Sequence, residues 1–172
     1  AGILFVCSAG NEGADVDQIP EFPSGFGGLP TCLSVAAMTS TDNLAPFSSF
    51  GHRSVGVAAP GQSIISTAPR SQFSPNGSYA TLSGTSMSAP YASGIAVLLS
   101  SHEPSLTPAQ VKRRIIATSE PIPALVSKTA NSGRANALSA LTNRIAPPQS
   151  PIVLSASFTK KAVTLDGFGF LN

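Results

Sequence analysis

The most constraining feature of this sequence is a run of 15 residues, Met87 to Ser101, that contains no charged side chain. Its bulky apolar residues recur at helical spacing, and its many small residues allow close approach to a sheet. A helix on the protein surface needs a polar face, so the run predicts a helix that is buried on most of its circumference. We expect Pro90 in its first turn, where a missing N–H group costs little.

A serine stands where this helix begins, because Gly84 is followed by Thr85 and Ser86. The first N–H groups of a helix have no partner within it, and with the helix dipole they favour negative charge nearby. Ser86 could therefore act as a nucleophile whose tetrahedral oxyanion those groups stabilise. The alternative is that Ser86 or Thr85 only caps the helix, which is the commoner role of such residues.

A second candidate follows the apolar run Ile3 to Cys7, which predicts a strand buried on both faces of a parallel sheet. The glycine-containing loop Ser8 to Gly13 would then lie at the carboxyl edge of the sheet, where open α/β sheets bind ligands. Asn11 in this loop can donate its side-chain amide to an oxyanion without carrying charge. A simple turn role is the alternative, because asparagine is common in turns.

The composition fits one globular domain of 172 residues with 42% hydrophobic content. Only 10% of residues are charged, against a usual share of about 25%, which favours a secreted or extracellular protein. Lys112, Arg113 and Arg114 would not share one helix face, so we expect no nucleic-acid partner. No apolar segment reaches the ~20 residues of a membrane span, and we expect no membrane partner. Cys7 and Cys32 are either buried free thiols or a disulfide bridge.

Two segments resemble a known family. Gly84-Thr85-Ser86-Met87-Ser88-Ala89-Pro90, followed by a helix of small residues, closely resembles the nucleophile motif of the subtilisin-like serine peptidases (subtilases, peptidase family S8). Ala9-Gly10-Asn11-Glu12-Gly13 after an apolar strand is similar to the oxyanion-hole segment of that family. The resemblance covers about Gly2 to Leu141 and implies the subtilisin-like three-layer α/β fold, with a mostly parallel sheet, present here in part.

The resemblance also implies roles for individual residues. Ser86 would attack the peptide carbonyl to form an acyl-enzyme, and Asn11 with the Ser86 N–H would hold the oxyanion. Residues implied to bind substrate are Ser8, Ala9, Gly10, Glu21 and Thr85. Glu21 precedes Phe22-Pro23, a position that the resemblance places towards the bottom of the S1 pocket, where a carboxylate would favour Lys or Arg at P1. A solvated loop glutamate is the alternative for Glu21.

Two members of the catalytic triad are missing. The family runs Asp, His, Ser, with the histidine about 150 residues before the serine, but only 85 residues precede Ser86. His52 lies in an expected surface turn and His102 follows the serine, so neither is a triad candidate. We therefore expect a missing N-terminal portion of the same domain as a partner, besides a polypeptide substrate. The alternative is a non-catalytic homologue that binds peptides, but retention of Ser86 and Asn11 favours the enzyme.

The chain divides into three parts by composition. Residues 1–145 are expected to be the C-terminal portion of the catalytic domain, and the proline-rich residues 146–151 are expected to be a linker. Residues 152–172 are expected to be a short truncated β segment, the start of an immunoglobulin-like β-sandwich. Leu106 to Gln110 predicts a capping box that opens a helix over 108–118, and Ser132 to Leu138 is expected to open a last short helix. We expect no cofactor, because Asp15 and Asp17 could bind Ca²⁺ but supply too few of its 6 to 8 oxygen ligands.

Overall fold

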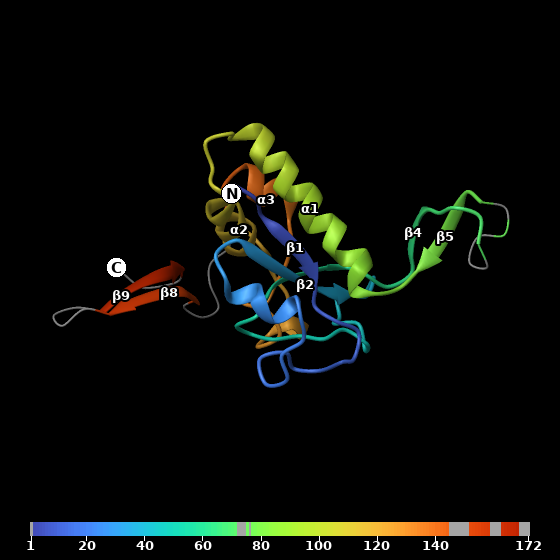
Figure 1. The fold of residues 1–172 in the computed structure, drawn as a ribbon, viewed down its shortest axis with the longest axis horizontal. Helices are drawn as coiled ribbons and strands as arrows, with labels where there is room; N and C mark the ends of the chain where they lie inside the picture. The colour runs from blue at the N-terminus through green and yellow to red at the C-terminus, as the bar shows by residue number, and fades with distance from the viewer. Residues whose placement is uncertain (1, 72–74, 76, 145–151, 159–162, 169–172) are drawn as a thin grey trace.

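The structure is a computed structural model that describes residues 2–71, 75, 77–144, 152–158 and 163–168 (Figure 1). Its main sheet has five strands, four of them parallel, and the last strand in the sheet pairs antiparallel. In order across the sheet they are β1 (Phe5–Ser8), β2 (Cys32–Met38), β3 (Val55–Pro60), β7 (Gly133–Arg134) and β6 (Glu120–Pro121). The expected mostly parallel α/β sheet is thus confirmed.

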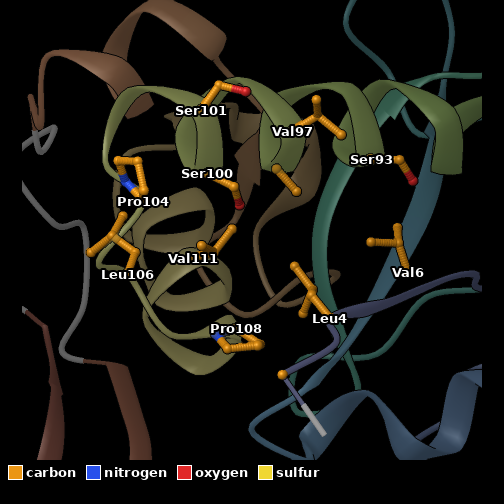
Figure 2. Close-up of a pocket in the computed structure, with 12 residues that line it drawn as sticks. Leu4, Val6, Ser93, Val97, Ser100, Ser101, Pro104, Leu106, Pro108 and Val111 are labelled. Carbon is orange, nitrogen blue, oxygen red and sulfur yellow. The ribbon is translucent and has the colours of Figure 1, made fainter.

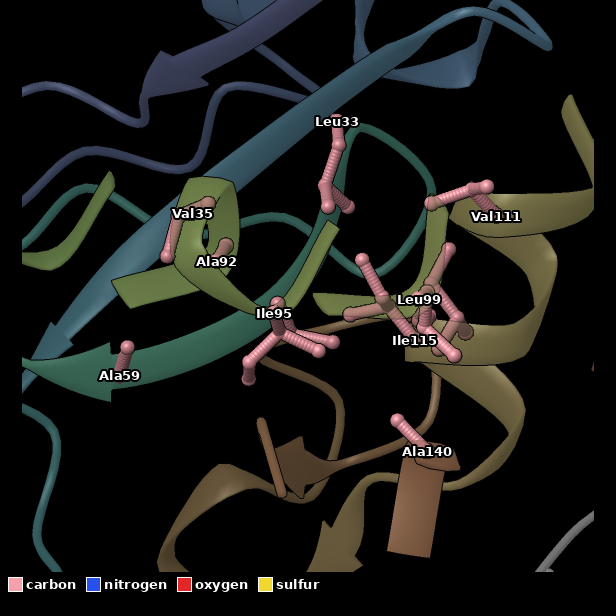
Figure 3. Close-up of a cluster of buried hydrophobic side chains, with 12 residues drawn as sticks. Leu33, Val35, Ala59, Ala92, Ile95, Leu99, Val111, Ile115 and Ala140 are labelled. Atoms are coloured by element: carbon pink, nitrogen blue, oxygen red, sulfur yellow. The ribbon is translucent and has the colours of Figure 1, made fainter. Parts of the chain in front are cut away.

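Three helices, α1 (Thr85–His102), α2 (Pro108–Ala117) and α3 (Ala137–Leu141), contribute to one hydrophobic core with β2 and β3 (Figure 3). Leu33 and Val35 of β2 point into this core, where they meet Ile95 and Leu99 of α1. Strand residues alternate between faces, so Ala36 and Met38 belong to a second buried cluster. The short 3-10 helices η1 (Ser24–Gly28) and η2 (Pro123–Leu125) lie in the loops between strands.

The strand at the start of the chain is less buried than predicted. β1 is the edge strand of the described sheet, and Phe5 is 53% exposed. Ile3, two residues before Phe5 in the chain, is 67% exposed. The expectation of a strand covered on both faces is therefore wrong for the described residues, because Cys7 is the only buried residue of β1 and Phe5 is exposed.

The predicted central helix forms, but it is buried along one stripe only. That stripe contains Thr85, Ser88, Ala92, Ile95 and Leu99, at the three- and four-residue spacing of one helix face. Val97 is 65% exposed and Leu98 49%, so burial on most of the circumference is wrong for the described residues. The helix begins at Thr85, which makes Pro90 its sixth residue rather than a first-turn residue.

The other predicted elements differ mainly at their ends. The capping box of α2 is confirmed, since Thr107 and Gln110 exchange side-chain to backbone hydrogen bonds. Residues 133 and 134 form β7 instead of opening a helix, and Asn136 caps α3 through the Ser139 N–H. β4 (Ile64–Thr67) and β5 (Tyr79–Leu82) form an antiparallel hairpin that projects from the body of the domain (Figure 1).

The last part of the chain contains a second antiparallel hairpin, β8 (Ile152–Phe158) with β9 (Val163–Phe168), which forms its own two-stranded sheet. The linker expected at 146–151 lies outside the described residues, and the division into domains stays a prediction. Among the helices that the structure describes, none is long and apolar enough to cross a membrane.

The two cysteines are free and buried. Their Sγ atoms are 3.9 Å apart on adjacent parallel strands. Phe5 is the register partner of Cys32, and Ser34 that of Cys7, so the cysteines lie two residues out of register. From strand rise and spacing this offset separates their Cα atoms by about 8 Å, beyond the range that a disulfide normally spans. Of the two possibilities left open by the sequence, the structure has the free thiols.

Candidate active site

The hairpin formed by β4 and β5 directly precedes α1 in the chain. Three hydrogen bonds hold the junction between β5 and α1 in place. The Gly84 N–H donates to the Gly61 carbonyl at 2.8 Å, and the Ser63 N–H donates to Ser83 Oγ at 2.9 Å. In the first turn of α1, Ser88 Oγ donates to the Ala59 carbonyl at 3.0 Å. The start of the helix is therefore held against the carboxyl end of β3.

This close approach needs a glycine beside the helix. A Cβ atom on Gly61 would overlap Ser88 Oγ and would come too close to Ala37 Cβ. Ser88 itself is fully buried, so it has no room to withdraw without losing its hydrogen bond. The packing of Gly61 against Ser88 thus decides how near the first turn of α1 lies to the sheet.

Ser86 is exposed at the second position of α1, whereas Thr85 before it is fully buried. The neighbouring N–H groups have partners, because that of Thr85 donates to Asn11 Oδ1 at 2.9 Å and that of Met87 to the Gly84 carbonyl at 3.0 Å. Within the described part of the chain the Ser86 N–H has no such partner. An exposed hydroxyl and a free helix N–H group therefore occur on the same residue.

Asn11 lies in the loop after β1, and its carboxamide is oriented by Thr85. Asn11 Oδ1 accepts from the Thr85 N–H and also from Thr85 Oγ1 at 3.1 Å. With the oxygen occupied, the amide nitrogen is left to donate, and it lies 3.7 Å from the Cβ position of Gly84, two residues before Ser86. The structure thus brings together the predicted nucleophile and the predicted oxyanion donor.

The predicted substrate-binding residues at the end of β1 are also tied to this junction. The Gly10 N–H donates to Thr85 Oγ1 at 3.2 Å, and the Gly10 carbonyl lies 3.2 Å from the same hydroxyl, whose single hydrogen is shared between this carbonyl and Asn11 Oδ1. Ala9 is fully buried and its N–H donates to the Val35 carbonyl at 3.0 Å, while Ser8 is half-buried. Gly10 has φ 113°, a conformation that favours glycine and turns the loop towards α1.

Glu21, which comes from a different loop, places its carboxylate beside Gly10, and the carboxylate of Glu12 lies there too. A Cβ on Gly10 would overlap the Glu21 carboxylate and lie 2.8 Å from Glu12 Oε2, so the two carboxylates lie beside each other over Gly10. Burial raises the pKa of Glu21, and the hydrogen bond and negative charge of Glu12 raise it further. Sequence reasoning missed Glu12, although its place directly after Asn11 was a usable signal.

The model of the subtilase family matches residues 1–161, which is most of the chain. The chain belongs to the subtilase family.

Relatives of this subtilase chain include extracellular enzymes of bacteria. It is 35% identical over 150 residues to an extracellular protease of Xanthomonas campestris, covering 84% of the chain and 24% of that relative. It is 36% identical over 162 residues to an extracellular basic protease of Dichelobacter nodosus, covering 88% of the chain and 26% of that relative. The chain spans 24% to 29% of these bacterial relatives and of a Bacillus subtilis subtilisin, and 7% of subtilisin-like protease 2 of Plasmodium falciparum.

Solved structures share the fold. A protease from Pseudoalteromonas arctica superimposes with a TM-score of 0.72 at 27% identity, covering 83% of this chain and 43% of that one. A cold-adapted subtilisin-like serine proteinase gives a TM-score of 0.60 at 29% identity, covering 78% and 44%. This subtilase chain therefore has the subtilisin-like fold over less than half of a complete neighbour.

Neither histidine lies near the candidate nucleophile. His52 is exposed in the loop before β3, at the amino edge of the sheet, and its Nδ1 is 3.3 Å from the Thr129 carbonyl. His102 is the last residue of α1, about 24 Å along the helix from Ser86 at the usual rise per residue. The described residues thus place no histidine beside Ser86.

The loop carboxylates considered for calcium are occupied by N–H donors. Asp17 accepts from the backbone N–H groups of Arg53 at 2.7 Å and Ser54 at 2.8 Å. Asp15 accepts from the Asp17 N–H and from the Gln18 side chain. No group of three or more His, Cys, Asp or Glu side chains suited to a metal occurs among the described residues. Calcium binding to this loop stays untested.

A hollow on the domain lies away from Ser86 (Figure 2). It is lined by the start of β1 and by the C-terminal half of α1 and the segment after it, with Leu4, Val97 and Leu106 among its apolar residues. Ser100 and Ser101, at the end of α1 opposite to Ser86, also line it. The hollow therefore has a mixed polar and apolar lining and is not part of the candidate active site.

Proposed function

We propose that Ser86 is the nucleophile of a serine endopeptidase that hydrolyses peptide bonds through an acyl-enzyme. Ser86 Oγ attacks the scissile carbonyl while a histidine takes its proton and later passes it to the leaving amine. Water then cleaves the ester between Ser86 and the acyl group. The Asn11 amide and the Ser86 N–H donate to the oxyanion, whose negative charge is largest in the transition state.

One observation carries this proposal more than any other. The Thr85 N–H and hydroxyl both donate to Asn11 Oδ1, which leaves the Asn11 NH₂ group as a donor beside the exposed Ser86. A helix cap would use only the oxygen of a side chain, and a plain turn would not need a buried threonine to orient the amide. A fixed amide donor next to a free helix N–H suits an oxyanion.

The aspartate and histidine of the triad are proposed to come from sequence outside these 172 residues. The exposed outer edge of β1 and the exposed apolar side chains Val97 and Leu98 of α1 support this, since both are surfaces that further chain could cover. The partial coverage of the relatives and of the solved neighbours also fits. The partner of this chain would then be the remainder of its own catalytic domain.

The substrate is proposed to be a polypeptide with Lys or Arg at P1. Glu21 and Glu12 place two carboxylates over Gly10, next to the candidate oxyanion hole. A cationic side chain bound there would relieve the repulsion between the two carboxylates and gain charge-assisted hydrogen bonds. Extracellular action is part of the proposal, supported by the names of the Xanthomonas and Dichelobacter relatives and by the low charge content.

The test is covalent labelling of the protein as its gene encodes it. Wild type should hydrolyse peptides and react with a serine-directed phosphonate, and Ser86→Ala should do neither. Ser100→Ala changes an exposed serine on the same helix and should behave as wild type. Labelling of the Ser86→Ala protein would contradict the proposal. Peptide binding by a wild type that is never labelled would instead identify a non-catalytic homologue.

A further inference from the structure

The loop that carries Glu21 is not anchored by its large apolar side chains. These are exposed, namely Phe22, Phe26 and Leu29. Among residues 21–30 only Ser24 and Gly27 are buried. Burying one large apolar side chain contributes about 1.5 to 3 kcal/mol, and this loop gains little of that free energy. Hydrogen bonds to its backbone must therefore fix its position.

Lys112 of α2 supplies two such bonds. Its Nζ donates to the Gly27 carbonyl at 2.6 Å and to the Leu29 carbonyl at 2.7 Å. These carbonyls lie at the C-terminal end of η1, where the last carbonyl groups of a helix have no partner within it. A lysine side chain can cap such an end. Lys112 therefore caps η1, although it lies 83 positions beyond Leu29 in the chain.

The Lys112 ammonium group is buried without a carboxylate partner. Burial is the main cause that lowers its pKa to about 8, and the neighbouring Cys32 and Cys7 oppose part of this shift, so Lys112 is still mostly charged at pH 7. Within the described part of the chain no Asp or Glu forms an ion pair with it. A buried charge is costly unless hydrogen bonds satisfy it. The two carbonyls at the end of η1 are the acceptors that do so here.

Hydrogen bonds continue from this capped end to Glu21. The Leu29 N–H donates to the Phe26 carbonyl at 2.8 Å, which closes the last turn of η1. At the start of η1, the Glu21 carbonyl accepts from the Gly25 N–H at 2.6 Å and from Ser24 Oγ at 3.0 Å. The backbone of Glu21 thus belongs to the same short hydrogen-bonded segment, residues 21–29, as the carbonyls that Lys112 holds.

Gly27 places this segment directly against the sheet. A Cβ atom on Gly27 would overlap the Ser54 carbonyl group, which comes just before β3. The segment therefore has no room to move further towards the sheet, and without the Lys112 bonds it can only move outwards. Such a movement carries the Glu21 carboxylate away from Gly10, over which it lies.

We propose that Lys112 is a positioning residue for P1 specificity, which caps η1 and thereby holds the Glu21 carboxylate over Gly10. This role of Lys112 rests on the proposed peptidase function, because Glu21 selects at P1 only if Ser86 cleaves peptides. Lys112 acts through η1 and takes no part in the reaction at Ser86. Its removal should therefore raise KM for substrates with Lys or Arg at P1 and leave kcat nearly unchanged.

The test compares wild type with Lys112→Met, each made as the gene encodes the protein. Two peptide substrates differ only in Arg or Leu at P1, and labelling with a serine-directed phosphonate counts the active sites. Methionine keeps an unbranched side chain but removes the donors. The Arg-to-Leu ratio of kcat/KM should fall about tenfold, since a charge-assisted contact to P1 is weakened. Arg113→Met removes the same charge from the exposed neighbour on α2 and should keep the wild-type ratio.

A double-mutant cycle separates positioning from a general loss of structure. If Lys112 acts through Glu21, then Lys112→Met should not change the ratio further in a Glu21→Gln protein. A further fall there, or an equal loss for both substrates per labelled site, would overturn the positioning role.

The same experiment distinguishes this role from the proposed function. A wild type that the phosphonate does not label would overturn the peptidase and the positioning role together, whereas labelling with an unchanged ratio in Lys112→Met would overturn the positioning role alone. Circular dichroism shows whether Lys112→Met folds. If it does not, Lys112→Gln, which keeps a neutral donor, decides by the same ratio, and an unchanged ratio again overturns the role.

Discussion

The backbone N–H of Thr85 donates a 2.9 Å hydrogen bond to Asn11 Oδ1, although 74 positions separate the two residues in the sequence. The Thr85 hydroxyl donates to the same oxygen at 3.1 Å and also bonds the backbone of Gly10. One buried residue therefore sets the position of the loop after β1 and the direction of the Asn11 amide. The proposed nucleophile follows it directly in the chain.

Thr85→Val should lower kcat by up to about tenfold while KM changes little. Valine keeps the shape and the backbone N–H but removes the hydroxyl, which contributes about 1 kcal/mol as a neutral hydrogen bond. The Asn11 amide then loses part of its orientation, which matters most in the transition state. Thr85→Ser keeps the hydroxyl and should retain most activity. A rise in KM with unchanged kcat would contradict this positioning role.

Asn11→Ala should lower kcat by about 10² to 10³, the cost of removing the side-chain oxyanion donor in subtilisin. Substrate binding should stay nearly intact, because the amide acts mainly on the transition state. Steady-state kinetics on a peptide ester and a peptide amide measures both constants. If kcat stayed the same and KM rose, Asn11 would be only a binding residue.

Glu21→Gln should reduce the preference for Lys or Arg at P1, and Glu12→Gln should do so to a similar extent. Each removes one of the two carboxylates that lie over Gly10. Profiling a peptide library with varied P1 residues measures the preference as kcat/KM ratios. Glu103→Gln serves as a control, since that carboxylate pairs with Arg114 at the C-terminal end of α1. Identical P1 profiles for wild type and both variants would refute the S1 assignment.

Asp17→Asn should destabilise the fold at pH 7 and lose that effect in acid. Burial alone would raise the pKa of Asp17, but hydrogen bonds from the backbone N–H groups of Arg53 and Ser54 outweigh burial and lower it. A lowered pKa stabilises the fold above the pKa of the unfolded chain, about 3.9, and this contribution fades as pH falls below it.

The change in unfolding free energy should be about 2 kcal/mol at pH 7, since two hydrogen bonds to a charged group are weakened. Urea unfolding of the Ser86→Ala protein with and without Asp17→Asn, at pH 7 and pH 3, measures it. The difference between the two proteins should be smaller at pH 3 than at pH 7, because the contribution is lost as pH falls through the lowered pKa of Asp17. An equal difference at both values would show that the carboxylate charge is not the cause.

The 172-residue chain on its own should hydrolyse no peptide, because no described histidine lies near Ser86 to accept its proton. Adding the remainder of the proposed catalytic domain, in the same chain or as a separate one, should restore turnover. It should also slow amide exchange in β1, whose outer edge is open here. Normal turnover by the isolated chain would contradict this and would make His52 a candidate base.

Local sequence signals predicted the elements that depend on near neighbours. The capping box of α2 formed as predicted because Thr107 and Gln110 are three residues apart and close the motif between themselves. The small-residue run of α1 also gave the right element type. Burial was predicted less well, because the exposure of Phe5 and Val97 depends on what covers β1 and α1, which their own sequences do not contain.

The sequence by itself determined the family, the nucleophile motif and the two candidate residues Ser86 and Asn11, since these rest on short strings of adjacent residues. Only the tertiary structure showed that Thr85 orients Asn11, that Glu12 joins Glu21 over Gly10, and that Cys7 and Cys32 are free thiols in hydrogen-bond contact. These relationships join residues that lie apart in the chain. Strand register and loop course fix such distances, and no local pattern of side chains encodes either one.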